Sequence, residues 1–289
     1  MQVNITDISR YAADLIQSSP SGFIHSVYQH TINIQTDKGL IALQSSGSVI
    51  SPISLIAGLD LDTLGAYGIS RGVPVHLAEN FIQIMSPVFV TLSLETLTYH
   101  TPFLSAHLEK SKTDLFSHRL FQVLSSSSDL GFRQILTSLP ASNESASPII
   151  SMASQYLEDC SKYLSKKAYR PAAKAAIKLI GLGIGLTPSG DDFLCGVLAG
   201  LSLASLESHP FTNALKEEIS SHLCDTNDIS AAFLSCALKN MYSQPVLSLV
   251  SMKSPSKIGH EFSKIGHSSG MDTLCGIYYI LTQRERLIG

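Results

Sequence analysis

The sequence predicts an α+β protein, with a small N-terminal lobe resembling a β-barrel or sandwich and a mainly α-helical C-terminal lobe. Short β-rich runs separated by glycine and proline fill the first hundred residues, whereas the chain beyond residue 149 shows helical patterns only. Its length of 289 residues is more than one hydrophobic core usually supports, so two lobes are expected.

The N-terminal lobe is expected to start with a helix over residues 6–17. A period-two apolar pattern on both sides of Asp37-Lys38-Gly39, over residues 27–34 and 40–43, then predicts a β-hairpin. Several short strands with glycine and proline turns favour a small barrel or sandwich. The further strands are expected at residues 48–53, 73–76 and 81–94.

The texture becomes helical from about residue 100, and serine-rich stretches at 125–128 and 140–148 are typical of loops. We therefore expect a β-rich domain over residues 1–120, a connector over 121–148 and a helical domain over 149–289. The expected helices beyond the connector span residues 150–168, 171–180, 190–207, 211–223, 229–242, 256–264 and 270–284.

Composition excludes several classes of protein. The net charge of −3 and pI of about 6.3 give no electrostatic footprint for nucleic acid. With 44% apolar and 15% charged residues and a mean hydropathy of +0.20, the chain is not disordered, and a large core or a buried subunit interface is expected. The apolar run 193–206 is too short to cross a bilayer and predicts a buried helix.

The location and redox state follow from the N-terminus and the cysteines. The first residues carry charged side chains and no apolar signal segment, so we expect a cytoplasmic protein that binds no membrane. Five cysteines without a CxxC pair are expected to be reduced and mostly buried.

An internal repeat is the most informative feature of the sequence. Ser189-Gly-Asp-Asp-Phe-Leu-Cys-Gly196 matches Ser269-Gly-Met-Asp-Thr-Leu-Cys-Gly276 at six of eight positions, and each copy follows a glycine-containing loop and enters an apolar run. A structural interpretation explains much of it. Ser189 and Ser269 would cap two helices with Asp192 and Asp272 reaching back, and the small residues would let the two helices approach closely.

Capping does not explain the glycines of the first loop, the second carboxylate Asp191 or His267 in the second loop. Glycines let exposed amides and helix N-termini bind an anion, such as phosphate or a small carboxylate. The aspartates would oppose an anion placed on them, so they would accept hydrogen bonds from an NH₂ group, hold a divalent cation or only cap. A ligand with an anionic end and an NH₂ end satisfies the whole set.

The known sequence motifs for nucleotide binding and for catalytic nucleophiles do not match these loops. The glycines do not form G-x-G-x-x-G or a P-loop, and Ser189 lacks the glycines of a nucleophile elbow. Cys195 would lie about one turn inside a helix, which disfavours a Cys–His pair. The polar cluster from Asp225 to Ser230 opens another expected helix, where Thr226, Asn227 or Asp228 would be the cap and would add ligand contacts. His267 would donate a proton or bind an anion.

Gly183 to Asp192 together with Gly266 to Gly276 resemble the two signatures of the AllH family. The resemblance is strongest over residues 175–285, and the N-terminal hairpin resembles the opening of the family. It implies a subunit of oxamate carbamoyltransferase, the enzyme of anaerobic allantoin degradation, which acts with two companion subunits. The implied reaction interconverts oxalurate and phosphate with oxamate and carbamoyl phosphate. The Ser-Thr-Arg-Thr-Arg motif of the familiar carbamoyltransferases is absent.

On this basis the expected site has three catalytic residues: Asp192 and Asp272 hold NH₂ groups and His267 donates a proton. The substrate-binding residues are expected to be Gly183, Gly185, Thr187, Ser189, Gly190, Asp191, Thr226, Asn227, Ser268, Ser269, Gly270 and Thr273. No cofactor is expected, although Mg²⁺ is left open, and the expected partners are the companion subunits or further copies of this chain.

Two other classes remain open from the sequence. A metal-dependent amidohydrolase would use Asp191, Asp192, Asp272 and His267 as ligands, but their spacing is not diagnostic. A non-catalytic ligand-binding or scaffolding subunit is the other, because the active site of a multi-chain enzyme can lie on a companion.

Overall fold

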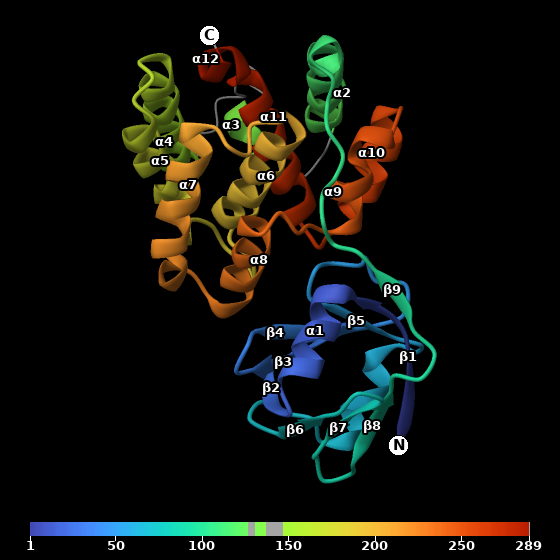
Figure 1. The fold of residues 1–289 in the computed structure, drawn as a ribbon. Coiled ribbons are helices and arrows are strands. Elements are labelled where there is room, and N and C mark those ends of the chain that lie inside the picture. Colours follow the sequence, from blue (N-terminus) through green and yellow to red (C-terminus); the bar gives the residue numbers. More distant parts are fainter. Residues whose placement is uncertain (127–130, 137–146, 289) are drawn as a thin grey trace. The chain divides into compact units, whose positions relative to one another are not determined.

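A computed structural model describes residues 1–126, 131–136 and 147–288, apart from the side chains of residues 65 and 66 (Figure 1). The chain forms two units, residues 1–103 and 104–289. Residues 104–120, which the sequence analysis assigned to the β-rich domain, thus belong to the helical unit, and the connector expected over 121–148 lies partly outside the described residues. Among the described residues, no helix has both the length and the apolar character needed to span a membrane.

The first unit is a closed β-barrel, which confirms the predicted barrel-like lobe. Eight strands close because β1 pairs with β8 through residues 2–4 and with β5 through residues 5–8, while β9 pairs with the end of β1. Closure leaves few unpaired strand edges. The strands are β1 (Gln2–Ser9), β2 (Ser21–Val27), β3 (Thr31–Thr36), β4 (Leu40–Gln44), β5 (Ser54–Ala57), β6 (Pro74–Leu77), β7 (Phe81–Ile84), β8 (Val90–Ser93) and β9 (Thr98–His100).

The start of the chain differs from the expectation. Residues 6–9 belong to β1, and the helix α1 (Arg10–Ser18) begins only after them, because Ser9 accepts a hydrogen bond from the amide of Ala12 and caps the helix. The expected strand at 48–53 is also wrong, since the strand here is β5. The barrel interior is filled by fully buried aliphatic side chains, among them Ile34, Leu43, Leu55, Ile82 and Leu92.

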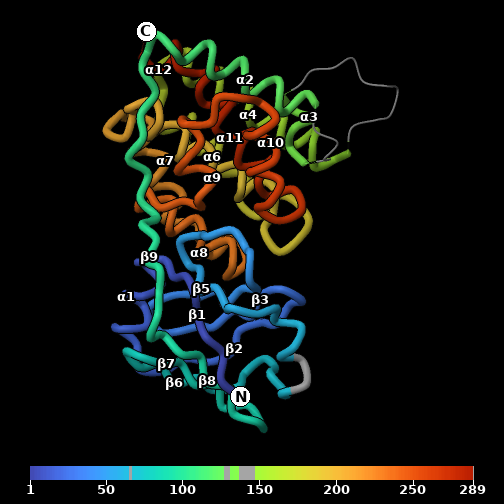
Figure 2. Tube along the Cα trace, turned by 90° about the vertical axis from the view of Figure 1, so that its right-hand side faces the viewer, coloured from blue at the N-terminus to red at the C-terminus, as the bar shows by residue number. Residues whose placement is uncertain are grey.

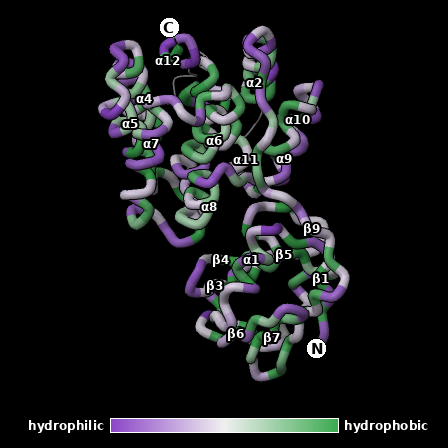
Figure 3. Tube along the Cα trace, in the orientation of Figure 1, coloured by the Kyte–Doolittle hydropathy of each residue, from purple (hydrophilic) through white to green (hydrophobic). Residues whose placement is uncertain are grey.

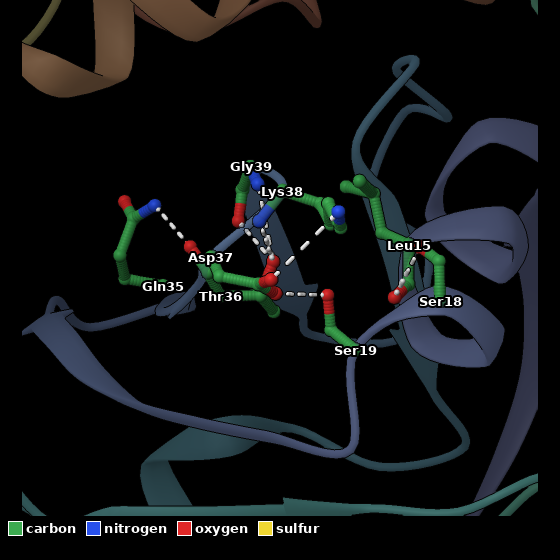
Figure 4. A network of polar contacts seen from close by, with 8 residues as sticks. All are labelled: Leu15, Ser18, Ser19, Gln35, Thr36, Asp37, Lys38 and Gly39. Carbon is green, nitrogen blue, oxygen red and sulfur yellow. Dashed lines mark hydrogen bonds and ion pairs between the residues drawn. The ribbon is translucent and has the colours of Figure 1, made fainter.

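The predicted hairpin is confirmed as β3 and β4, joined by Asp37-Lys38-Gly39. Figure 4 shows the polar contacts of this turn. The hydroxyl of Thr36 accepts hydrogen bonds from the amides of Lys38 and Gly39, both at 3.1 Å, and the hydroxyl of Ser19 donates to Asp37 at 2.5 Å. The turn is therefore anchored to the segment that follows α1.

The second unit is helical, as predicted. The helices expected beyond the connector correspond to α4, α5, α6, α7, α8, α10 and α11, whereas the five-residue helices α9 and α12 were not predicted. The longer elements are α2 (Thr113–Ser126), α4 (Pro148–Ser165), α5 (Tyr169–Ala176), α6 (Ser189–Leu203), α7 (Pro210–Ser221), α8 (Asp228–Leu238), α10 (Pro255–Ser263) and α11 (Ser269–Thr282). The short ones are η2 (Lys110–Lys112), α3 (Arg133–Leu136), η3 (Ile177–Leu179), η4 (Leu223–Asp225), α9 (Gln244–Ser248), η5 (Leu249–Ser251) and α12 (Arg284–Ile288).

Helices α6 and α11, which carry the two copies of the repeat, pack along each other at the centre of this unit (Figures 1 and 2). Nearly every residue of both is buried, and hydropathy colouring shows hydrophobic residues along α6 and hydrophilic ones on the outer helices α4, α5 and α7 (Figure 3). Helices α6 and α11 are therefore buried on all sides, as expected for core helices.

The helix crossing depends on two equivalent glycines. A Cβ at Gly196 would overlap the carbonyl oxygen of Thr273, and one at Gly276 would overlap that of Phe193. Thr273 and Phe193 also occupy equivalent positions in the repeat, so the contact is reciprocal. The prediction that small residues let the two helices approach is confirmed.

We expect Gly276→Ala to lower the free energy of unfolding by about 3 kcal/mol, because the added methyl group meets backbone that cannot move without separating the helices. Gly259→Ala is the matched control, since its Cβ would make only ordinary contact with Val123 and alanine favours a helix. Thermal unfolding of both variants measures the difference. Equal stability of the two variants would contradict this view of the crossing.

Candidate functional site

The two loops that precede the repeat copies bring their hydroxyls together. The first loop, residues 181–188, leads into α6, and the second, residues 264–268, leads into α11. The Thr187 and Ser269 hydroxyl oxygens lie 2.7 Å apart and form a hydrogen bond between the two copies. Both side chains are partly exposed. The site is therefore built on two adjoining helix N-termini.

The capping interpretation of the repeat is wrong. Pro188 and Ser268 occupy the cap positions, and neither makes a side-chain capping hydrogen bond. Ser189 and Ser269 are the first residues inside their helices, where the hydroxyl of Ser269 bonds across to Thr187. Ser269 therefore uses its hydroxyl for a long-range contact with Thr187 and not for capping its own helix.

Asp191 joins the glycine loop to the polar cluster that precedes α8. One carboxylate oxygen accepts the amide hydrogen of Gly181 at 2.9 Å, and the other accepts the hydroxyl hydrogen of Thr226 at 2.5 Å. Burial raises the pKa of Asp191, and hydrogen bonds from Thr226, Gly181 and Ser230 lower it in part. Both oxygens of Asp191 are thus used to hold this region together.

Asp192 is buried, at 9% exposure, yet its Oδ2 atom has no hydrogen-bond partner within the part of the chain that the structure describes. Burial raises the pKa of Asp192 well above its ordinary value. The hydroxyls of Ser269 and Thr187 lower it in part, while the neighbouring Asp272 and Asp191 raise it further. The carboxyl group is therefore adjacent to the pair of hydroxyls that joins the two copies.

Asp272 is completely buried and binds a backbone amide of the segment 131–132. Its Oδ1 atom accepts the amide hydrogen of Phe132 at 2.6 Å, and Gly131 packs so closely that a Cβ there would overlap the carboxylate. Sequence reasoning missed Gly131 and Phe132, because they lie about 140 residues before Asp272 and carry no motif.

The remaining predicted residues have varied environments. Asn227 caps α8 by accepting from the amides of Ile229 and Ser230, which confirms the predicted capping of this helix. The hydroxyl of Thr273 donates to the carbonyl oxygen of Ser269 within α11, and His267 is exposed.

The glycine loop keeps Gly183 and Gly185 at positive φ, 136° and 123°, which a residue with a side chain rarely adopts. Between and after them, Ile184 is 86% exposed and Leu186 is 51% exposed. The loop thus presents two apolar side chains to solvent beside the hydroxyl pair.

The cysteines near the site are not poised as nucleophiles. Cys195 and Cys275 are buried, and burial raises their pKa well above the ordinary value, with Asp192 and Asp191 adding to the shift at Cys195. Four of the five cysteines are buried and all are free, as expected.

Among the described residues, a group of side chains that could hold a metal ion lies elsewhere. The group of His, Cys, Asp or Glu atoms gathered within 4.8 Å consists of His30, Asp60 and Asp62, all exposed on the barrel. The absence of a bound metal at Asp191, Asp192 and Asp272 stays a prediction.

A cavity of about 730 Å³ also lies away from these residues. Its lining comes from α3, α4, α11 and α12 and includes Lys162, Tyr279 and Arg286. None of the predicted site residues contributes to its lining. This cavity is therefore separate from the predicted site residues.

Comparison with known proteins gives two matches. Residues 4–97 match the model of the AllH family N-terminal domain, and residues 179–281 match the model described as oxamate carbamoyltransferase subunit AllH. The first match covers most of the barrel, and the second includes both copies of the repeat. No curated protein and no solved structure matches the chain.

We expect Asp192→Asn to raise the melting temperature at neutral pH, by an amount equivalent to about 1–3 kcal/mol, because asparagine carries no negative charge into the buried site. Above pH 3.8 the carboxyl ionises in the unfolded chain and stays protonated in the folded one, so wild-type stability falls as pH rises toward the raised pKa. Asparagine does not ionise, so Asp192→Asn lacks this fall in stability with pH.

Thermal unfolding from pH 4 to pH 8 measures the effect, and the two proteins should converge at the acidic end. A less stable Asp192→Asn at neutral pH would show instead that the folded chain stabilises an ionised Asp192.

Proposed function

We propose that this chain, which belongs to the AllH family, forms the ligand site of an oxamate carbamoyltransferase together with companion subunits. The reaction we assign interconverts oxalurate and phosphate with oxamate and carbamoyl phosphate. The observation that carries the proposal is the buried Asp192 adjacent to the Thr187–Ser269 hydroxyl pair, at the meeting point of two helix N-termini.

The ligands of this reaction fit such a site. Oxamate and oxalurate carry a carboxylate and an NH₂ group, and carbamoyl phosphate carries a phosphate and an NH₂ group. Helix N-termini and hydroxyls favour the anionic end, which we place near Thr187, Ser189, Ser268 and Ser269. A carboxylate favours the NH₂ end.

The chemistry needs one proton transfer. An oxygen of hydrogen phosphate attacks the ureido carbon of oxalurate, the C–N bond breaks and its electron pair goes to the nitrogen of oxamate. That nitrogen gains a proton and the phosphate oxygen loses one, so the balance closes without another reactant. We assign His267 to this transfer, while the two helix N-termini hold the reactants in place.

A non-catalytic binding subunit is the second candidate. The exposed Ile184 and Leu186 beside the hydroxyl pair favour it, because a companion chain that covers them would also approach the ligand. In that case this chain binds the ligand and the companion supplies the catalytic groups.

We expect His267→Ala and Asp192→Asn to lower the turnover of the assembled complex by about a hundredfold or more. His267 is exposed, so its replacement should leave assembly intact on size-exclusion chromatography. The control is His260→Ala, an exposed histidine on α10. Wild-type turnover in both variants would refute the assigned roles.

Calorimetry of the purified chain tests where the ligands bind. We expect saturable binding of oxamate and carbamoyl phosphate in the presence of EDTA, because the hydroxyls and carboxylates need no metal for these contacts, and weaker binding by Ser269→Ala. If binding strictly required Mg²⁺, the carboxylates would be assigned as metal ligands and not as acceptors for the NH₂ group. No binding by the single chain, with binding by the assembled complex, would favour a site shared with the companions.

A further inference from the structure

We propose that the two aspartates of the repeat have different tasks: Asp272 positions the chain's own segment 131–132, and Asp192 selects a ligand with a primary amide. This inference rests on the proposed function and goes beyond it, because it assigns the recognition of the NH₂ group to one of the two carboxylates.

The first step is the equivalence of the two positions. Gly196 packs on the carbonyl of Thr273, and Gly276 packs in the same way on that of Phe193. The two helix starts are therefore related by an approximate local twofold axis. Asp192 and Asp272 occupy matching places on α6 and α11.

The second step is the partner of Asp272. Its carboxylate accepts the backbone amide of Phe132 at 2.6 Å, and Gly131 leaves just enough room for this approach. The chain thus shows, at one of the two matching places, how the aspartate of the repeat binds an amide N–H.

The third step is the placement of Asp192. Asp272 is completely buried, whereas Asp192 is 9% exposed and acts on the partly exposed hydroxyls of Thr187 and Ser269. The Oδ2 atom of Asp192 is buried and lacks a hydrogen-bond partner in the described residues, although both oxygens of the adjacent Asp191 are used. A buried acceptor left unpaired is costly, so the folded chain is short of one donor here. A ligand N–H supplies that donor, as Phe132 does at Asp272.

Charge selects the kind of ligand. The ionisable groups that act on Asp192 are Asp191 on its own helix and Asp272 on α11, and the thiol of Cys195 lies near both Asp191 and Asp192. None of these groups carries a positive charge. At a pH where Asp192 is ionised, a second carboxylate at this place is repelled, whereas an NH₂ group is attracted.

Oxamate and oxalate make the sharpest probe. They have nearly the same size, and oxalate carries O⁻ where oxamate carries NH₂. If Asp192 reads this group, the wild-type protein prefers oxamate, and Asp192→Asn loses the preference because its amide can donate to oxalate.

The experiment measures the dissociation constants of both compounds by calorimetry, with the assembled complex at mildly alkaline pH. We expect wild type to bind oxamate at least about tenfold more tightly than oxalate, and Asp192→Asn to lower that ratio by about tenfold. Asp272→Asn should lower thermal stability, because a neutral amide oxygen accepts the Phe132 hydrogen bond less strongly than a carboxylate, and should keep the ratio in the folded fraction. Asp225→Asn, an exposed and charge-matched change, should leave the ratio and the stability unchanged.

The outcomes separate this inference from the proposed function. An unchanged ratio in Asp192→Asn, in a complex that still turns over oxamate, overturns the task of Asp192 and leaves the reaction standing. If the preference for oxamate over oxalate falls in Asp272→Asn and not in Asp192→Asn, the two tasks are reversed and the inference is overturned. Failure of the wild-type complex to bind oxamate or to turn it over refutes the proposed function, and the inference with it.

Discussion

The close contact between α6 and α11 is the constraint on which the helical unit depends. Two glycines at equivalent positions let the backbone of each helix touch the other, and both helices are buried along nearly their whole length. This contact places two helix N-termini side by side, so that Thr187 of one loop reaches Ser269 of the other copy. The polar site and the apolar packing therefore have a common origin, because both follow from the repeat.

The three aspartates around this contact have different surroundings. Asp191 holds the glycine loop and the segment before α8, and Asp272 holds the segment before α3. Both carboxylates accept amide or hydroxyl hydrogens of the chain, which offsets part of the cost of their burial. Asp192 has a buried Oδ2 atom without a hydrogen-bond partner among the described residues, as expected where a protein gives up some stability for binding.

Much of this could be predicted from the sequence, for identifiable reasons. Glycine and proline turns indicated the barrel, and the repeat indicated two facing helix starts with small residues between them. The role of Ser189 and Ser269 could not be predicted, because a serine before an apolar run has the same local sequence whether it caps its own helix or bonds to a distant hydroxyl. Phe132 and Gly131 were missed for a related reason, since a backbone amide leaves no trace in the sequence.

The way in which the barrel closes has a consequence for how the chain folds. The first strand, β1, pairs with β5, β8 and β9, and with no strand that is close to it in sequence. Strands β2 to β4 and β6 to β8 form from neighbouring segments, so they can pair early through short loops. On the ribosome, β1 is made first and yet waits until about residue 93 has been synthesised before its last barrel partner exists. Although β1 can pair with β5 once residue 57 exists, the barrel closes only with β8, in a late, long-range step.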